Sequence, residues 1–315
     1  MEITSTNKSG YSSVLYGTTQ TSTVQKLQNE TLNHNNTGVI YETGNDIEGY
    51  GLYTQAGISV DRLAHNYQIQ NALHSLGFYS GPTDGRLGTD LSKKAIKNFQ
   101  TVYGLFESGE MNGATKTKLS KAYTMKCLIA SSTAAKEIDR AFDRYTLDYT
   151  QRDTFANTWV FLRVGMELTV KQTAGVCGNI MNESVFSADN LQDNYTDRST
   201  LGAHNKDYKY KTNDGKGYGL LQWTFADRKK RLQKKAKNMG LSVSNLNAQL
   251  AFFREEMLTG SDFKDAWQDI KSATTVKEAS DIFLKRIENP RYKNYAERRK
   301  YGRTIYKIMK NLSGV

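Results

Sequence analysis

Two short stretches of the chain contain residue types with which a protein could transfer a proton. The first, GNIMNES, covers residues 178–184 and places Glu183 two residues after the apolar pair Ile180 and Met181. The second, GYGLLQWT, covers residues 217–224 and carries Gln222 in an apolar, glycine-containing turn. A carboxylate is costly to bury among apolar side chains, so the position of Glu183 requires a physical explanation.

The neighbours of Glu183 predict a helix over residues 173–184, with Glu183 at its C-terminal end. The inward-facing positions of this helix are Ala174, Cys177, Ile180 and Met181. Apolar surroundings and the negative end of a helix dipole both disfavour a carboxylate, so we expect the pKa of Glu183 to be raised. A carboxylic acid that is protonated near neutral pH can protonate a glycosidic oxygen. On spacing alone, a surface glutamate near a helix end is the commoner interpretation.

The glycine-containing turn has the residue types of a sugar-binding wall. Glycine lets the backbone approach a ligand closely, and a glutamine amide offers both a donor and an acceptor to hydroxyl and acetamido groups. Aromatic rings give flat faces for pyranose rings. The two leucines of the turn are expected in the core. From these residue types we favour a place in the cleft for Tyr218 and Gln222, whereas Trp223 could belong either to the core or to the cleft.

A second carboxylate is less clearly marked. Inverting hydrolysis of a glycosidic bond needs a base about 6.5–9.5 Å from the acid, with room for a water molecule. The interval 185–216 is polar and predicts a long loop or small sheet beside a cleft. Its aspartates are individually typical of solvated loops, and we retain Asp197 and Asp214 as candidates. The full set between the two stretches is Asp189, Asp193, Asp197 and Asp214.

Composition indicates a folded chain with an anionic partner. The sequence has 315 residues and 38% hydrophobic content, which is sufficient for buried cores. Residues 1–150 contain 14 basic and 14 acidic side chains, whereas residues 151–315 contain 29 and 18, so the net charge of +11 lies in the second half. A basic surface indicates a nucleic acid, a membrane or an anionic wall polymer as partner.

Other features limit the possible classes of site and location. Two cysteines, Cys127 and Cys177, and four scattered histidines form no disulfide framework and no metal-ligand spacing, so no metal or cofactor is expected. No window approaches the roughly 18 apolar residues of a membrane span. The N-terminus lacks the pattern of a secretory signal, so we expect synthesis in the cytoplasm and action elsewhere after release.

Residues 59–125 predict a small helical module. Apolar residues at helical spacing precede Gly77, turn residues follow in SGPTDGRLG, and a second helix with Thr89 or Asp90 as cap carries Leu91 and further apolar residues on one face. This stretch resembles the three-helix peptidoglycan-binding module of many wall hydrolases. The matching residues are Gln70, Leu73, Gly77, Asp84, Gly85, Gly88, Ala95, Phe99, Gln100, Leu105, Gly109, Thr115 and Leu119. Leu91 departs from the threonine usual there.

The two motifs of the second half also carry a resemblance. Together, TAGVCGNIMNESVF and GYGLLQWTFADRKKRL are similar to the phage tail lysozyme family, within the superfamily of goose-type lysozymes and lytic transglycosylases. The resemblance covers residues 155–300 and implies Glu183 as the catalytic acid. It also implies a cleft wall formed by Gly217, Tyr218, Gly219, Gln222 and Trp223. The AYNAG-like third motif of transglycosylases is absent, which favours hydrolysis. The segment IENPRYKNYAERR could take its place, with Glu288, Tyr292 or Tyr295 near the cleft but not catalytic.

The predicted architecture is mainly α: a three-helix peptidoglycan-binding module joined to a lysozyme-like, mostly helical catalytic domain. Residues 1–58 are expected to form a polar segment that is either flexible or a docking segment. Residues 126–150 are expected to form a helical linker, and residues 151–315 the catalytic domain. The implied function is an endolysin-like muramidase, with a lytic transglycosylase or a non-catalytic wall-binding or tail protein as alternatives. Peptidoglycan is the expected partner, with anionic wall polymers and a phage tail or holin-dependent release as further candidates.

A basic run, DRKKRLQKKAKNMG, supports the rival class of a nucleic-acid-binding or membrane-binding protein. Its charges surround apolar residues at helical spacing, as in a basic amphipathic helix. No nucleic-acid motif accompanies the run, and a solvated helix face is its commonest explanation. We therefore expect no specific nucleic-acid partner.

Overall fold

A computed structural model describes the chain over most of the two predicted modules. The described residues are 60–132, 134, 137–138, 147–192, 202–260, 263–290 and 293–312. All of them belong to one compact unit that spans residues 38–315. Within this described part the chain forms ten α-helices, and its only β-type pairing is two isolated bridges, Leu191 with Tyr218 and Tyr218 with Trp223. The mainly α prediction is confirmed.

The N-terminal module is built from α2 (Val60–Ser75), α3 (Asp90–Tyr103) and α4 (Gly113–Ser131). Gly77, with a φ of 76°, follows α2, and its N–H donates to the carbonyl of His74 at 2.9 Å. Thr89 caps α3 by accepting a hydrogen bond from the N–H of Ser92. The helices pack around fully buried apolar side chains, among them Leu73, Phe99 and Leu119. The predicted helix end and helix cap are therefore confirmed, and α4 continues beyond residue 125.

Two buried glutamines hold the two loops of this module. The amide of Gln70 accepts from the N–H of Gly85 at 2.7 Å and donates to Asp84 at 3.0 Å. The amide of Gln100 accepts from the N–H of Gly109 at 2.8 Å and donates to the hydroxyl of Thr115 at 3.0 Å. Because buried polar groups must be paired, both glutamines have a structural role. Leu91 differs from its prediction: it is 46% exposed in the first turn of α3, while Ala95, Ile96 and Phe99 are buried.

The second half of the described chain is a set of helices with two π-helical turns. In order, these are α6 (Tyr149–Val160), η1 (Phe161–Gly165), α7 (Val170–Ser184), α8 (Ala226–Met239), α9 (Leu246–Leu258), α10 (Lys264–Ser272), α11 (Val276–Ile282), η2 (Phe283–Glu288) and α12 (Tyr295–Met309), with the short 3-10 turn η3 (Lys310–Leu312) after α12. The π-turn η2 directly continues α11, and its wider winding ends at Glu288. Such turns frequently occur at functional sites.

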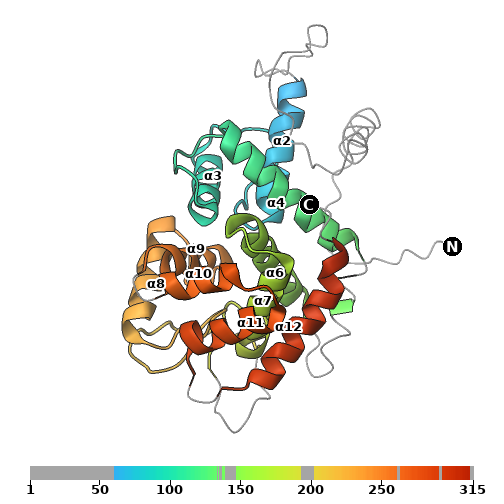
Figure 1. Ribbon diagram of the computed structural model, residues 1–315. Helices are drawn as coiled ribbons and strands as arrows, with labels where there is room; N and C mark the ends of the chain where they lie inside the picture. Colours follow the sequence, from blue (N-terminus) through green and yellow to red (C-terminus); the bar gives the residue numbers. More distant parts are fainter. Residues whose placement is uncertain are drawn as a thin grey trace, which may run out of the picture. The chain divides into compact units, whose positions relative to one another are not determined.

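Helices α7, α11 and α12 pack closely because glycines line their contacts (Figure 1). A Cβ atom on Gly178 of α7 would lie 2.5 Å from the backbone nitrogen of Gly302 and 2.6 Å from the carbonyl oxygen of Arg298, both in α12. A Cβ atom on Gly175 would lie 2.8 Å from the backbone of α11. Real carbon contacts are not that short. Because glycine has no side chain, the backbones of α7, α11 and α12 can approach one another closely along the helix that carries Glu183.

We expect Gly178→Ala to destabilise the fold by about 1–3 kcal/mol, as overpacking of a close contact does. The clashing atoms belong to backbone, so they cannot rotate away as a flexible side chain would. Urea unfolding would measure the loss. Gly113→Ala is the matched control, because a Cβ there meets nothing within 4 Å. Equal unfolding midpoints for the two variants would contradict this account of the helix contact.

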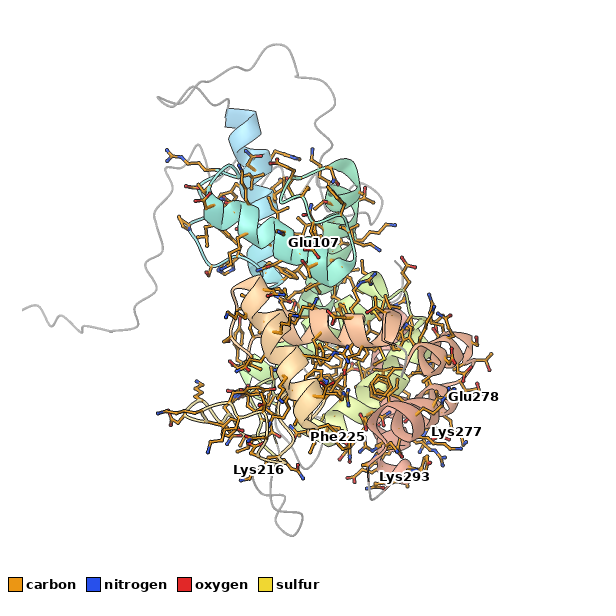
Figure 2. All side chains as sticks on the ribbon, turned by 90° about the vertical axis from the view of Figure 1, so that its left-hand side faces the viewer. Glu107, Lys216, Phe225, Lys277, Glu278 and Lys293 are labelled. Carbon is orange, nitrogen blue, oxygen red and sulfur yellow. The ribbon has the colours of Figure 1, made fainter. Side chains whose placement is uncertain are left out.

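The basic run forms α8, but much of its charge is already paired. Lys229 is fully buried and donates to Asp214 at 2.6 Å, which corrects its predicted place on a solvated face. The guanidinium of Arg228 forms two hydrogen bonds with the carboxylate of Glu256, and Lys235 forms an ion pair with Glu255. The charges of α8 follow an apolar residue, Phe225, which directly precedes the helix and is 71% exposed (Figure 2). The interpretation of the basic run as a solvated helix face is therefore wrong at Lys229.

Two further observations bear on the predictions made from sequence. No helix among the residues that the structure describes is long and apolar enough to cross a membrane. The polar segment 1–58, together with Asp193, Asp197 and Tyr292, lies outside the described residues.

Candidate active site

Glu183 lies in the last turn of α7, as predicted, although the helix begins earlier, at Val170. A capping box fixes that start: Thr169 and Gln172 exchange hydrogen bonds between side chain and backbone. After Ser184 the chain turns sharply, because Val185 adopts a φ of 51° and Phe186 a φ of 56°. A β-branched residue in this region is strained, and the burial of both side chains holds it there. The helix therefore ends one residue after Glu183.

Three elements bring charged groups together at this helix end. Arg298 of α12 donates from Nη2 to Oε1 of Glu183 and from Nη1 to Oε2 of Glu288, the last residue of η2. The side chains of Arg298 and Glu288 are 3% and 6% exposed, whereas that of Glu183 is 19% exposed. We call these three residues the carboxyl–arginine cluster. Glu183 is its only member with substantial access to solvent.

Asn179, one turn before Glu183, connects the cluster to α7 and α11 through hydrogen bonds. Its side-chain oxygen accepts from Nη1 of Arg298 at 3.1 Å. Its amide nitrogen donates to the carbonyl of Gly175 at 2.9 Å and to the carbonyl of Ser280 at 3.1 Å. One fully buried amide thus connects α7, α11 and α12, and it fixes the orientation of the guanidinium group.

The electrostatics of the cluster differ between its members. Burial raises the pKa of Glu288 well above its ordinary value; Arg298 opposes this shift, while the charge of Glu183 and a hydrogen bond between the two carboxyl groups add to it. Burial lowers the pKa of Arg298, but the two carboxyl groups outweigh burial and raise it overall. The arrangement therefore pairs a permanent cation with two carboxyl groups, of which Glu288 favours its protonated form.

The glycine-containing turn at residues 217–223 is joined directly to the end of α7. The hydroxyl of Ser184 donates to the carbonyl of Leu220 at 2.9 Å, and the N–H of Leu220 donates to the side chain of Gln249 at 2.9 Å. Tyr218 and Trp223 exchange backbone hydrogen bonds at 3.2 and 3.1 Å. The structure therefore brings the two sequence motifs together, through the serine that follows Glu183.

Gln222 is half-buried and adopts a φ of 48° at the tip of this turn. Its amide nitrogen donates to the carbonyl of Gly219 at 2.9 Å and to Asn190 at 3.2 Å. The amide therefore shapes the turn from within. Its role toward a sugar stays a prediction.

Trp223 and the glycines of the turn differ from their predicted roles. Trp223 is fully buried, and its indole N–H donates to Glu256 at 2.9 Å, so its ring offers no face to a sugar. Gly219, with a φ of 78°, has its bare Cα against the amide of Gln249, and Gly217 is similarly close to the side chain of Gln222. These glycines accommodate protein groups. The leucines of the turn are buried, as predicted.

Asp214, a candidate for the second catalytic carboxylate, is already bound to other side chains. It accepts from Lys229 at 2.6 Å and from the hydroxyl of Tyr208. Although partial burial raises its pKa, the hydrogen bonds from Lys229 and Tyr208 lower it to about 2. Asp189 is also engaged: its carboxylate lies 2.5 Å from His204, whose other ring nitrogen lies 2.9 Å from Asp148. Both aspartates therefore anchor the loops before the glycine-containing turn.

Tyr218 lines a cavity of about 280 Å³ on the surface of this loop region. Its ring lies 5.4 Å from that of Tyr208 and 5.1 Å from that of Tyr210, measured between centroids. Only 4% of Tyr218 is exposed. The remaining lining residues are Asp189, Asn205, Lys206, Ser242, Val243 and Ser244. Tyrosine rings, hydroxyls and one lysine could hold a polar ligand such as a sugar with an anionic substituent.

Sequence reasoning placed Glu288 near the cleft but missed Arg298. Glu288 does lie beside Glu183, whereas Tyr295 contacts the guanidinium of Arg299, 5.0 Å from its ring. Arg298 stands in the same quoted segment, in the first turn of α12, where arginine is usually solvated. No signal in a single sequence distinguishes this buried arginine from Arg299, its half-buried neighbour. No group of three or more metal-binding side chains occurs among the residues that the structure describes.

The described chain presents a glutamate at the end of a buried helix, and the serine after it joins that helix end to a glycine-containing turn. Residues 153–309 match the model of the phage tail lysozyme family, and residues 67–119 match that of a putative peptidoglycan binding domain. No curated protein and no solved structure matches the chain. The two family matches support a lysozyme-like cell-wall hydrolase with an N-terminal peptidoglycan-binding module. The second match supports peptidoglycan as the binding partner.

Proposed function

We propose that the protein cleaves the bond between N-acetylmuramic acid and N-acetylglucosamine in bacterial peptidoglycan, with Glu183 as general acid. The observation that carries this proposal is the position of Glu183. It is the accessible carboxyl of an otherwise buried cluster, and it stands next to the serine that joins α7 to the glycine-containing turn. Protonation of the glycosidic oxygen by Glu183 would allow the bond to break through an oxocarbenium-like transition state.

The surroundings of Glu183 suit this role. Arg298 fixes one carboxyl oxygen, so the other is left to face the substrate. The Tyr218 cavity and Gln222 would hold sugar rings or their substituents along the loops that follow. The module at residues 59–125, followed by a linker at residues 126–150, would keep the enzyme bound to peptidoglycan. The enzyme would act after release from a cell or as part of a virion.

A lytic transglycosylase is the second candidate, because neither Glu288 nor Asp214 suits the role of a base. Glu288 is buried behind Arg298, and Asp214 is bound to Lys229 and Tyr208. A transglycosylase needs no second enzyme carboxylate, since a hydroxyl of the muramic acid attacks. A hydrolase requires a further base, and Asp197 remains a candidate for it.

Mass spectrometry of fragments released from purified peptidoglycan tests both candidates. Reducing muramic acid ends would establish a hydrolysing muramidase, and anhydro-muramic ends a transglycosylase. Reducing glucosamine ends would show that a different bond is cleaved. Release of no fragments, together with retained binding to the wall, would favour a non-catalytic wall-binding protein.

A further inference from the structure

The carboxyl–arginine cluster has an unequal number of acids and bases. Two carboxyl groups face one guanidinium group, and all three lie at the contact of α7, η2 and α12. With both carboxyl groups ionised, the cluster would hold a net negative charge at a largely buried place. Buried charges without partners are costly, so retention of one proton makes the cluster neutral.

The hydrogen bonds of Glu288 also indicate that the cluster retains one proton. One oxygen of Glu288, Oε2, accepts from Arg298, whereas Oε1 is buried and has no hydrogen-bond donor in the protein. As a carboxylate, Glu288 would leave that oxygen unsatisfied at a cost. As a carboxylic acid, it can donate to the neighbouring carboxyl of Glu183. The geometry therefore accounts for a proton on Glu288 whenever Glu183 is ionised.

Exposure separates the roles of the two acids. Glu183 is the more accessible, whereas Glu288 is nearly buried behind Arg298. The charged groups that act on Glu288 are Arg298 from α12 and Glu183 from α7. Arg286, earlier in η2, is paired with Asp269 of α10. Glu288 would therefore affect the substrate only through Glu183.

We propose that Glu183, Glu288 and Arg298 form one proton-sharing unit, in which Glu288 is a positioning residue that keeps a proton available to Glu183. This inference rests on the proposed function of Glu183. In each turnover, the shared proton moves from Glu288 to Glu183 and from Glu183 to the glycosidic oxygen as the bond to the anomeric carbon breaks. The proton released by the attacking hydroxyl or water then returns to the pair. Arg298 stays charged throughout.

The test is the pH dependence of cell-wall cleavage by Glu288→Gln. Glutamine has the same shape and can still accept from Arg298, but it holds no exchangeable acid proton. Without the acid at position 288 the cluster keeps no shared proton, so the protonated form of the site would be lost at lower pH. We expect the alkaline limb of the pH–rate profile to move to lower pH by about one unit or more.

Two variants control this experiment. Glu288→Asp keeps an ionisable group and should restore the alkaline limb at least in part. Asp281→Asn breaks the acid–arginine pair between α11 and α12 that involves Arg299, one residue after Arg298, and should leave the profile unchanged. A Glu288→Gln profile with an unmoved alkaline limb would overturn proton sharing, even if the overall rate fell.

Stability measured against pH tests the same unit without any substrate. Because the folded-state pKa of Glu288 is raised, its stabilising contribution is fully present below its ordinary value of 4.5 and is lost as pH rises through the folded value. Glutamine does not titrate. The unfolding free energy of wild type minus that of Glu288→Gln should therefore fall as pH rises above that ordinary value. A difference independent of pH would overturn the proposal, whereas a pH-dependent difference in a protein without Glu183-dependent cleavage would overturn only the proposed function.

Discussion

Glu183→Gln is expected to lower the rate of glycosidic cleavage by about 10²–10⁴-fold, the contribution typical of a general acid. Glutamine can still accept from Arg298 through its side-chain oxygen, so the guanidinium keeps a partner. What is lost is the transferable proton. Turnover would be followed as sugar fragments released from purified peptidoglycan. The wall-binding module lies elsewhere in the sequence, so retention of the variant on insoluble wall should match that of wild type.

Two comparisons make this expectation specific. Glu278→Gln serves as a matched control: Glu278 lies at the surface in the first turn of α11 (Figure 2), and its partners are Thr274 and Thr275. Its variant should cleave peptidoglycan at the wild-type rate. Wild-type cleavage by Glu183→Gln would show that another group supplies the proton, and the assignment of Glu183 would then be wrong.

Arg298→Met is expected to destabilise the fold by about 3–5 kcal/mol, because it leaves two carboxyl groups in a buried site without their cation. Methionine approximates the length of the arginine stem, so the main loss is electrostatic. Asn179 also loses the donor for its side-chain oxygen. Chemical denaturation at neutral pH would measure the change. Retention of nearly wild-type stability would mean that the cluster contributes little to the fold.

A double variant separates charge from packing in this prediction. Glu288→Gln combined with Arg298→Met removes the buried acid together with the cation, so much of the stability lost in Arg298→Met should return. Cleavage should stay low, since Glu183 would lack its positioning groups. If the double variant is as unstable as the sum of the single variants, the loss arises from packing and not from an uncompensated charge.

The sequence predicted the local elements of this protein well, since their signals lie within a few residues. Helix periodicity identified α7 and the position of Glu183 at its end, and turn residues identified the first two helices of the N-terminal module. The resemblance to the phage tail lysozyme family connected the two motifs that Ser184 joins in space. Each of these predictions depended on the identity and spacing of neighbouring residues.

The errors share a different cause, which is burial of polar or aromatic groups against distant elements. Trp223 was predicted to face sugar, but Glu256 of α9 supplies a buried acceptor for its indole N–H. Lys229 was predicted to be solvated, but Asp214 is its buried partner. Arg298 acquires its role from Glu183, which is far away in sequence. Such partners become evident only after the helices have packed, so one sequence cannot reveal them.

The glycines of α7 have a consequence for engineering a more heat-resistant form of this protein. Replacing helical glycines by alanine is a common route to higher stability, because it restricts the unfolded chain. At Gly175 and Gly178 the same change would separate α7 from the helices that carry Ser280 and Arg298. A stabilisation programme should therefore begin at open positions such as Gly113, and it should preserve the spacing of α7, α11 and α12 around the candidate active site.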